Sequence, residues 1–183
     1  LCKKVYLDDL DVESLPLHFD KEFKYEDFSP LMVDSIAYFI HKNGGLVYEH
    51  KADSIVRIDN SFNHLMQTNS TIFTYNSKIH RFGGYGFWSA RNFITYFDNK
   101  STYQWEVVNP LNSNVIPEES IGGLHLVIND DFYIFNSYFN NPFNRFEDIL
   151  NEKLWKYNFV KKEWAYLGDI ELIMETPRPL PLP

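Results

Sequence analysis

The stretch that decides the fold is Ile79-His80-Arg81-Phe82-Gly83-Gly84-Tyr85-Gly86, followed by Phe97-Asp98 and then by Trp105. It has the pattern of a strand that ends in a glycine pair, a second strand that ends in an aromatic residue and an aspartate, and a third strand that begins with tryptophan. Glycine after a strand allows a positive φ and a close approach of another segment. With the strand-like residues 71–75 before it, the stretch predicts a small antiparallel sheet with a tight turn after its second strand.

A second copy of this pattern follows at an offset of 53 residues, the difference between positions 124 and 71. In this copy Asn136-Ser137 takes the place of the glycine pair, and the insertion before its third strand, at 146–150, fits a helical turn. The matched segments, first copy before second, are 71–75 with 124–128, 79–82 with 132–135, 94–98 with 154–158 and 105–108 with 164–167. Such self-similarity is typical of repeat proteins in which each unit is one small sheet.

Two structures fit the segment before the repeats. Ser29-Pro30 is typical of a helix start, and Asn43-Gly44 of a helix stop. Alternatively, Ile36–Ile40 is a strand, Asn43-Gly44 is a preferred turn pair, and Leu46–Tyr48 returns as the second strand of a hairpin. We favour the hairpin because everything after it is predicted to be β.

The composition favours strands and excludes several classes of function. Of the 183 residues, 17% are aromatic, and aromatic side chains favour strands, so the chain is predicted to be all-β. The net charge of −8 argues against binding to nucleic-acid backbones, which depends on Lys and Arg. Cys2 is the single cysteine and cannot form an internal disulfide, and no apolar run is long enough for a transmembrane helix. A cytoplasmic and an extracytoplasmic location both fit these properties.

The order of strand, glycine pair, aromatic-Asp and tryptophan resembles the kelch repeat. Gly83-Gly84, Phe97-Asp98 and Trp105 carry the resemblance in the first copy, and Tyr157 and Trp164 carry it in the second. The resemblance implies a kelch-type β-propeller, in which short four-stranded sheets stack around an axis. Kelch blades have about 50 residues, so the chain supplies about three blades of a partial or truncated ring. Self-association that completes the ring is one expectation.

The resemblance divides the chain into three parts. Residues 1–52 form an N-terminal β or irregular segment, in which Gly44-Gly45, with the later Ile58-Asp59, fits a degenerate blade. Residues 53–175 form the kelch-like region, and residues 176–183 form a proline-rich tail.

The most distinctive loop lies between the second and third strands of the first copy. Tyr85, Trp88 and Arg91 combine aromatic rings with a guanidinium group, and these residue types dominate binding interfaces. The corresponding loop of the second copy carries Tyr138 and Arg145. Such loops lie on the same face of a propeller, so we expect a binding face there. The alternative is a structural role, in which Phe87 and Trp88 pack under the neighbouring sheet and Arg91 pairs with a nearby acid.

No motif for catalysis, metal binding or cofactor binding stands out. The histidines lack metal-ligand spacing, and the adjacent acids fall in expected turns rather than in a catalytic pair. We therefore expect a non-catalytic module, without metal or cofactor, that binds another protein or a glycan. The alternatives are a carbohydrate-binding or carbohydrate-active propeller protein and a structural segment of a larger surface or scaffold protein.

Overall fold

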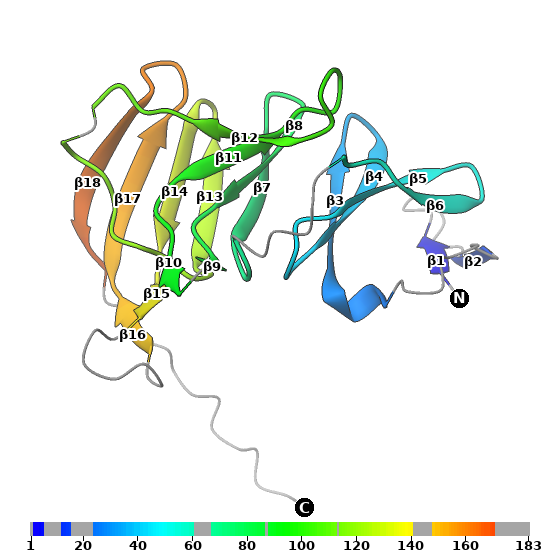
Figure 1. Ribbon diagram of the computed structural model, residues 1–183, viewed down its shortest axis with the longest axis horizontal. Coiled ribbons are helices and arrows are strands. Elements are labelled where there is room, and N and C mark those ends of the chain that lie inside the picture. The colour runs from blue at the N-terminus through cyan, green and yellow to red at the C-terminus, as the bar shows by residue number, and fades with distance from the viewer. Residues whose placement is uncertain are drawn as a thin grey trace, which may run out of the picture.

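The computed structural model describes residues 2–5, 12–15, 24–60, 67–86, 88–112, 114–140 and 148–170. These residues form an all-β structure of antiparallel sheets, as predicted (Figure 1). Their one helical element is a single 3-10 turn at Tyr25–Asp27. A hairpin of β1 (Cys2–Val5) and β2 (Val12–Leu15) precedes three four-stranded sheets. The predicted tail at 176–183 lies outside the described residues.

Sheet 1 confirms the predicted hairpin and excludes the helix. In this sheet Ile40 pairs with Val47 and Phe39 with Tyr48. Sheet 1 contains strands from both sides of the domain boundary that was predicted between residues 52 and 53. Its strands, each hydrogen-bonded to the next, are β3 (Phe28–Val33), β4 (Ile36–His41), β5 (Val47–Lys51) and β6 (Ser54–Arg57).

Sheet 2 corresponds to the first copy of the repeat. A short hairpin of β9 (Tyr85–Gly86) and β10 (Ser89–Ala90) is inserted between its second and third strands. The strands of the sheet itself are β7 (Thr71–Tyr75), β8 (Lys78–Phe82), β11 (Ile94–Phe97) and β12 (Trp105–Val108).

Sheet 3 corresponds to the second copy and has the same strand order. Its insertion is the hairpin of β15 (Ser137–Asn140) and β16 (Asp148–Asn151). The helical turn predicted at 146–150 is therefore wrong for Asp148–Leu150, which lie in β16. The strands of the sheet are β13 (Leu124–Ile128), β14 (Asp131–Phe135), β17 (Lys153–Asn158) and β18 (Glu163–Asp169).

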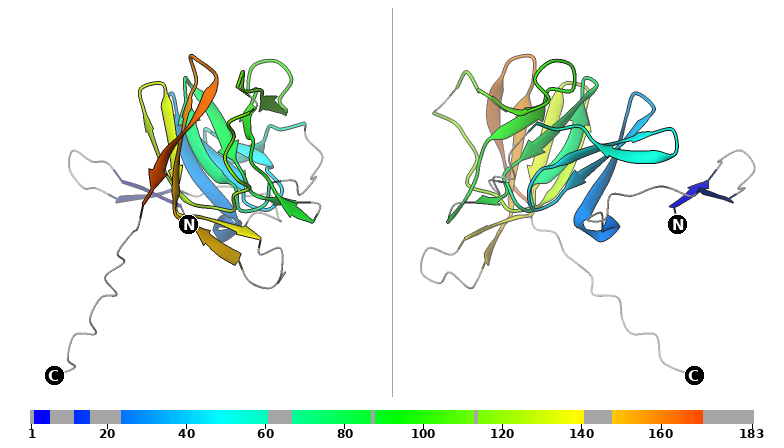
Figure 2. Two further views of the ribbon diagram at one scale, coloured as in Figure 1. Left: turned by 90° about the vertical axis from the view of Figure 1, so that its left-hand side faces the viewer. Right: turned by 45° about the vertical axis from the view of Figure 1, so that its right-hand side comes forward.

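The three sheets follow one another in chain order and pack face to face (Figures 1 and 2). Successive side chains of a strand point to opposite faces, so both faces of sheet 2 contribute to a core. One core lies between sheets 1 and 2 and is built from Val33, Tyr38, Ile40, Val47, Ile79 and Phe97. The other lies between sheets 2 and 3 and is built from Phe73, Phe82, Ile94, Phe132, Ile134, Trp155, Tyr157 and Trp164.

The face of sheet 3 that points away from sheet 2 is exposed. On β13, His125 and Val127 point towards sheet 2, where they contact or pack against its core. The alternating residues Leu124, Leu126 and Ile128 are 50%, 51% and 48% exposed. We call these three residues and the sheet surface around them the open face.

The first strands of the three sheets lie next to one another, β3 beside β7 and β7 beside β13. Because each sheet is an antiparallel meander, its first turn lies at the end opposite to the connection between its second and third strands. The turns at 34–35, 76–77 and 129–130 therefore share one end, which we call the turn end. The hairpins β9–β10 and β15–β16 share the other, which we call the hairpin end (Figure 1).

The turn after the second strand explains the glycine pair. Gly83 has φ +68°, and a Cβ there would lie 2.4 Å from the carbonyl oxygen of Ser120. Gly84 has φ +89° and would meet the backbone of Gln67 at 2.7 Å. In the second copy, Asn136 adopts φ 53° at the position of Gly83. Asparagine tolerates this conformation better than most residues, so the turn survives the loss of glycine.

Candidate binding site

The hairpin β9–β10 presents Trp88 to solvent at the hairpin end. Trp88 lies in the turn between the two strands, has φ 73° and is 89% exposed. This exposure contradicts the alternative in which Trp88 packs under a neighbouring sheet, while Phe87 lies outside the described residues. Tyr85 is half-buried at the base of the hairpin, where its amide and carbonyl bond the backbone of Thr68.

Arg91 follows the hairpin β9–β10 and forms hydrogen bonds with its backbone. Its Nη2 donates to the carbonyl oxygen of Gly86 at 3.0 Å, and its amide donates to the carbonyl oxygen of Gly84 at 2.8 Å. Arg91 forms no ion pair with any described acid, so the alternative in which Arg91 pairs with an acid is also wrong. The guanidinium group holds the loop in shape, and this role was not foreseen.

Tyr138 lies on the neighbouring hairpin, in the same region of the molecule. Backbone bridges join Arg91 to Ser120 and Ile121 to Tyr138, so the connection between sheets 2 and 3 links the two hairpins. The Tyr138 side chain is 47% exposed. Arg145 lies outside the described residues. Among the predicted site residues, the structure thus places Tyr85, Trp88, Arg91 and Tyr138 on or beside two neighbouring hairpins.

The predicted repeat residues lie in the sheets and their turns. Phe97 and Trp105 pack between sheets 1 and 2, and Tyr157 and Trp164 pack between sheets 2 and 3. Asp98 accepts hydrogen bonds from the amides of Lys100 and Thr102 in the next turn, at 3.2 and 2.9 Å. These contacts give the repeat residues structural roles.

Trp105 also covers a buried cation. The Arg81 guanidinium lies 3.7 Å from the centre of a Trp105 ring, while the indole Nε1 donates to the carbonyl oxygen of Gly45 at 2.7 Å. Burial lowers the pKa of Arg81 to about 9, against a smaller opposing effect from Asp59. Gly45 has φ +67°, and a Cβ there would lie 2.1 Å from Arg81 Nη1, so any other residue would displace the guanidinium group and strain the backbone.

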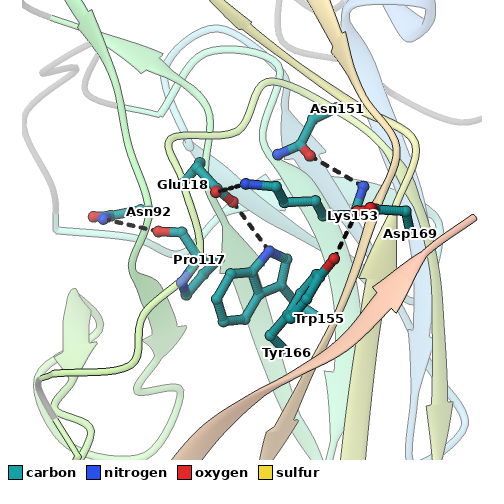
Figure 3. Close-up of polar contacts among 8 residues, drawn as sticks. All are labelled: Asn92, Pro117, Glu118, Asn151, Lys153, Trp155, Tyr166 and Asp169. Carbon is teal, nitrogen blue, oxygen red and sulfur yellow. Dashed lines mark hydrogen bonds and ion pairs between the residues drawn. The ribbon is translucent and has the colours of Figure 1, made fainter.

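A polar cluster fixes the connection between sheets 2 and 3 to the third strand of sheet 3 (Figure 3). Glu118 forms an ion pair with Lys153 and accepts a hydrogen bond from Trp155 Nε1 at 3.1 Å. The pKa of Glu118 is lowered, because desolvation, which raises it, is outweighed by the hydrogen bonds and the charge of Lys153. Nearby, Asn92 Nδ2 donates to the carbonyl oxygen of Pro117 at 3.2 Å. Sequence reasoning missed this cluster.

Behind this connection, a cavity of about 190 Å³ lies between sheets 2 and 3. Most of its lining is apolar, and none of the lining residues carries a formal charge at neutral pH. The residues that line it are Asn92, Phe93, Ile94, Val108, Pro110, Ile116, Tyr157 and Trp164.

A second hollow lies at the turn end, where the first strands of all three sheets finish. It is an open groove of about 310 Å³, lined mostly by polar groups from the three first hairpins. Ser77 Oγ donates to Asp34 Oδ1 at 2.7 Å, and Tyr75 donates its hydroxyl hydrogen to Asp130 Oδ1 at 2.7 Å. These two bonds tie sheet 1 to sheet 2 and sheet 2 to sheet 3 at this end.

Two kinds of site are not found in the part of the chain that the structure describes. No three His, Cys, Asp or Glu side chains there are grouped so that they could hold a metal ion. No helix there has the length and hydropathy needed to cross a lipid bilayer.

These features define an all-β protein built from consecutive four-stranded antiparallel sheets. No family model matches the sequence, and no curated protein does. Among solved structures, the chain is similar to the structure of YjhT, with a TM-score of 0.58 at 15% sequence identity. The match covers 79% of this chain and 52% of YjhT, so the chain spans about half the length of that protein. A likeness at this identity concerns the fold alone.

Proposed function

We propose that the chain is part of a kelch-type β-propeller that serves as a non-catalytic binding module. Three observations support the architecture: consecutive four-stranded meanders, face-to-face packing in chain order, and first strands that lie side by side. The kelch resemblance of Gly83-Gly84, Phe97-Asp98 and Trp105 agrees with it. In such a ring every sheet has a neighbour on both faces.

The open face supports the same proposal. Leu126 occupies the position in sheet 3 that Phe73 occupies in sheet 2, and Phe73 is 3% exposed because sheet 3 covers it. A further sheet packed in the same manner would cover Leu126. Light scattering on the chain and on Leu126→Glu tests whether a second copy supplies that sheet. A dimer that becomes a monomer in the variant supports self-association, and a monomer at every concentration contradicts it.

The observation that carries the binding function is the exposure of Trp88. An 89% exposed tryptophan at positive φ, held by Arg91 and placed near the half-exposed Tyr138, has no packing role. Tryptophan and tyrosine dominate the binding energy of protein interfaces and stack on sugars. We infer that the hairpin end binds another protein or a glycan through these rings.

The test compares Trp88→Ala and Tyr138→Ala with Tyr103→Ala. Tyr103 is a matched control because it also has positive φ, is 37% exposed and lies in a turn of sheet 2 at the other end. Each chain is immobilised and screened against a glycan array and a library of purified proteins. Binding that the first two substitutions abolish and the third preserves supports the proposal. Binding that is unaffected by Trp88→Ala contradicts it.

The groove at the turn end favours carbohydrate as a second candidate. Side chains with hydroxyl and amide groups line it, including Thr74, Asn76, Ser77 and Asn129, together with the carboxylate of Asp34. No Lys or Arg lines it, so phosphate and carboxylate ligands are disfavoured and neutral polyols are favoured. Titration of the chain and of Asn76→Ala with glucose and galactose, followed by amide NMR shifts, tests this. Shifts at residues 74–77 that the substitution removes support a sugar site.

A further inference from the structure

The turn between β4 and β5 contains Asn43-Gly44, the single Asn-Gly pair of the chain. In such a pair the backbone nitrogen of the glycine can attack the side-chain amide carbon of the asparagine and close a five-membered ring. Gly44 has no side chain that would hinder this closure. The sequence therefore places at this turn the residue pair that is most prone to an internal reaction of asparagine.

The His41 imidazole contacts the backbone nitrogen that would make this attack. The Gly44 amide donates to His41 Nδ1 at 3.1 Å, and the Asn43 amide donates to the same atom at 3.2 Å. Because both amides donate to it, Nδ1 carries no proton and acts as an acceptor. Phe28 packs edge-to-face against the imidazole at 5.1 Å, which holds the ring in this orientation. His41 is therefore placed as a base for the Gly44 amide proton.

The oxygen of the same peptide group is also hydrogen-bonded. Thr68 Oγ1 donates to the Asn43 carbonyl oxygen at 3.1 Å. The peptide group between Asn43 and Gly44 thus has a donor at its oxygen and a base at its N–H. Hydrogen bonds that are connected in this way polarise one another. Both contacts therefore favour the loss of the amide proton, which produces the nucleophilic nitrogen.

The side chain that is attacked is accessible. Asn43 is exposed, and its side-chain amide forms no hydrogen bond with the part of the chain that the structure describes. The side chain can therefore rotate towards the Gly44 nitrogen. Ammonia can leave into solvent, and water can reach the ring that forms. The two reacting groups belong to adjacent residues, so their effective concentration is high.

We propose that Asn43 is a modification site, at which the folded chain converts its own asparagine to aspartate or isoaspartate with His41 as the base. The Gly44 nitrogen attacks Asn43 Cγ and forms a new C–N bond, while its proton passes to His41 Nδ1. The bond from Cγ to Nδ2 then breaks, and His41 gives the proton to the leaving nitrogen. Ammonia departs and a succinimide remains. Water opens this ring at either carbonyl, so the net change is asparagine plus water to aspartate or isoaspartate plus ammonia.

The site lies at the hairpin end, because the β4–β5 connection occupies the same end of its sheet as β9–β10. Thr68, which bonds Asn43, also pairs with Tyr85 at the base of that hairpin. The reaction adds one carboxylate there to a net charge of −8. Isoaspartate also lengthens the backbone of the turn by one carbon, close to Gly45, whose carbonyl oxygen accepts the Trp105 Nε1 hydrogen bond. An effect on binding rests on the proposed function, whereas the reaction itself does not.

The test compares the folded chain with the same chain unfolded in guanidinium chloride, at the same neutral pH and temperature. After incubation, each sample is digested, and mass spectrometry follows the replacement of the Asn43 amide by a carboxyl group. Enzymatic methylation identifies isoaspartate. The folded chain is expected to react at least about tenfold faster, a small part of what a positioned base contributes. An equal or slower reaction in the folded chain would overturn the proposal, because the hydrogen bonds of the turn would then protect Asn43.

Three variants identify the groups that accelerate the reaction. His41→Phe keeps a ring beside Phe28 but removes the base, and it is expected to lower the folded rate to that of the unfolded chain. Thr68→Val removes one neutral hydrogen bond and is expected to slow the folded rate about fivefold. His50→Phe, on β5 of the same sheet, is the matched control with an unchanged rate, because His50 forms none of the hydrogen bonds of the turn.

Cooperative thermal unfolding shows that each variant folds. A folded His41→Phe chain that reacts as fast as the wild type contradicts the role of His41. A folded Thr68→Val chain with the wild-type rate contradicts the polarised peptide group.

Discussion

Sheets 2 and 3 carry the same sequence pattern but differ in what covers them. In sheet 2, Phe73, Phe82 and Ile94 point towards sheet 3 and are 3%, 1% and 2% exposed. In sheet 3, Leu126 occupies the position of Phe73 and is 51% exposed. The pattern therefore specifies how a sheet is built and which face is apolar. It does not specify whether a neighbour covers that face.

The two sheets also differ in how the preceding connection bonds their third strand. In sheet 2, Gln67 accepts a hydrogen bond from Thr95 Oγ1 at 2.8 Å and donates to the Gly83 carbonyl oxygen at 3.0 Å. In sheet 3, Glu118 bonds Trp155, which occupies the position of Thr95. The first contact is neutral and buried, while the second is ionic and partly exposed. The connection is thus attached to the third strand by neutral hydrogen bonds in sheet 2, and by an ion pair and a hydrogen bond in sheet 3.

The largest expected effect comes from truncating the same position in both sheets. Phe73→Ala removes a ring that stacks on Phe132 at 4.1 Å, and it is expected to cost about 4 kcal/mol of unfolding free energy. Leu126→Ala is expected to cost less than about 1 kcal/mol, because the side chain is half in water. Urea unfolding measures both values. A large loss in Leu126→Ala would falsify the exposure of the open face and indicate that a partner covers it.

The next largest loss of stability is expected from a substitution in the turn after the second strand. Gly83→Ala combines a positive φ with a contact of 2.4 Å to the Ser120 carbonyl oxygen, so we expect a loss of about 3 kcal/mol. Asn136→Gly, at the same turn of sheet 3, is the control and is expected to change stability by less than about 1 kcal/mol. Thermal unfolding compares the two. Equal losses would mean that the copies do not share this turn.

The architecture was largely predictable because it depends on local patterns. Alternating apolar residues, turn residues and the repeat spacing predicted the strands at 71–75, 79–82 and 94–97 and their second copies, and the structure confirms them. The hairpin at 36–48 was also predicted, although its residues fit a helix start and stop. The β16 strand was missed because its counterpart in the first copy, β10, is only two residues long and was not predicted either.

The site was predictable only in part, because its contacts join distant segments. Trp88 and Tyr138 stood out as aromatic residues in loops, and the structure places them on neighbouring hairpins. The pair of Glu118 with Trp155, and the cavity beside Tyr157, depend on how the connection at 110–118 folds over sheet 3.

The third prediction concerns the pH dependence of stability. It compares His80 in sheet 2 with the residue at the same position of sheet 3. His80 is buried beside Phe73 and Phe159, and burial lowers its pKa to about 4 from an ordinary value of 6.5. The unfolded chain therefore binds a proton that the folded chain excludes, and stability falls as the pH drops from 6.5 towards 4. We expect His80→Phe to abolish about 2 kcal/mol of the loss between about pH 7 and pH 5. Urea unfolding at both pH values measures it, with Tyr133→Phe, the same position of sheet 3, as the control that leaves the loss unchanged.

The smallest effect tests the ionic contact that distinguishes sheet 3. Glu118→Gln keeps the size of the side chain but removes the charge that faces Lys153, and it is expected to cost less than about 1 kcal/mol at neutral pH, because both side chains are partly exposed. Since the folded pKa of Glu118 is lowered, its contribution is present above the unfolded pKa and is lost as the pH falls through the folded pKa. The stabilities of wild type and variant should therefore converge in acid. Gln67→Ala in sheet 2 should instead show a loss that does not change with pH, because Gln67 and Thr95 do not titrate. A difference between wild type and Glu118→Gln that persists in acid would mean that Glu118 acts through hydrogen bonds without charge, as Gln67 does, and that the two connections share one chemistry.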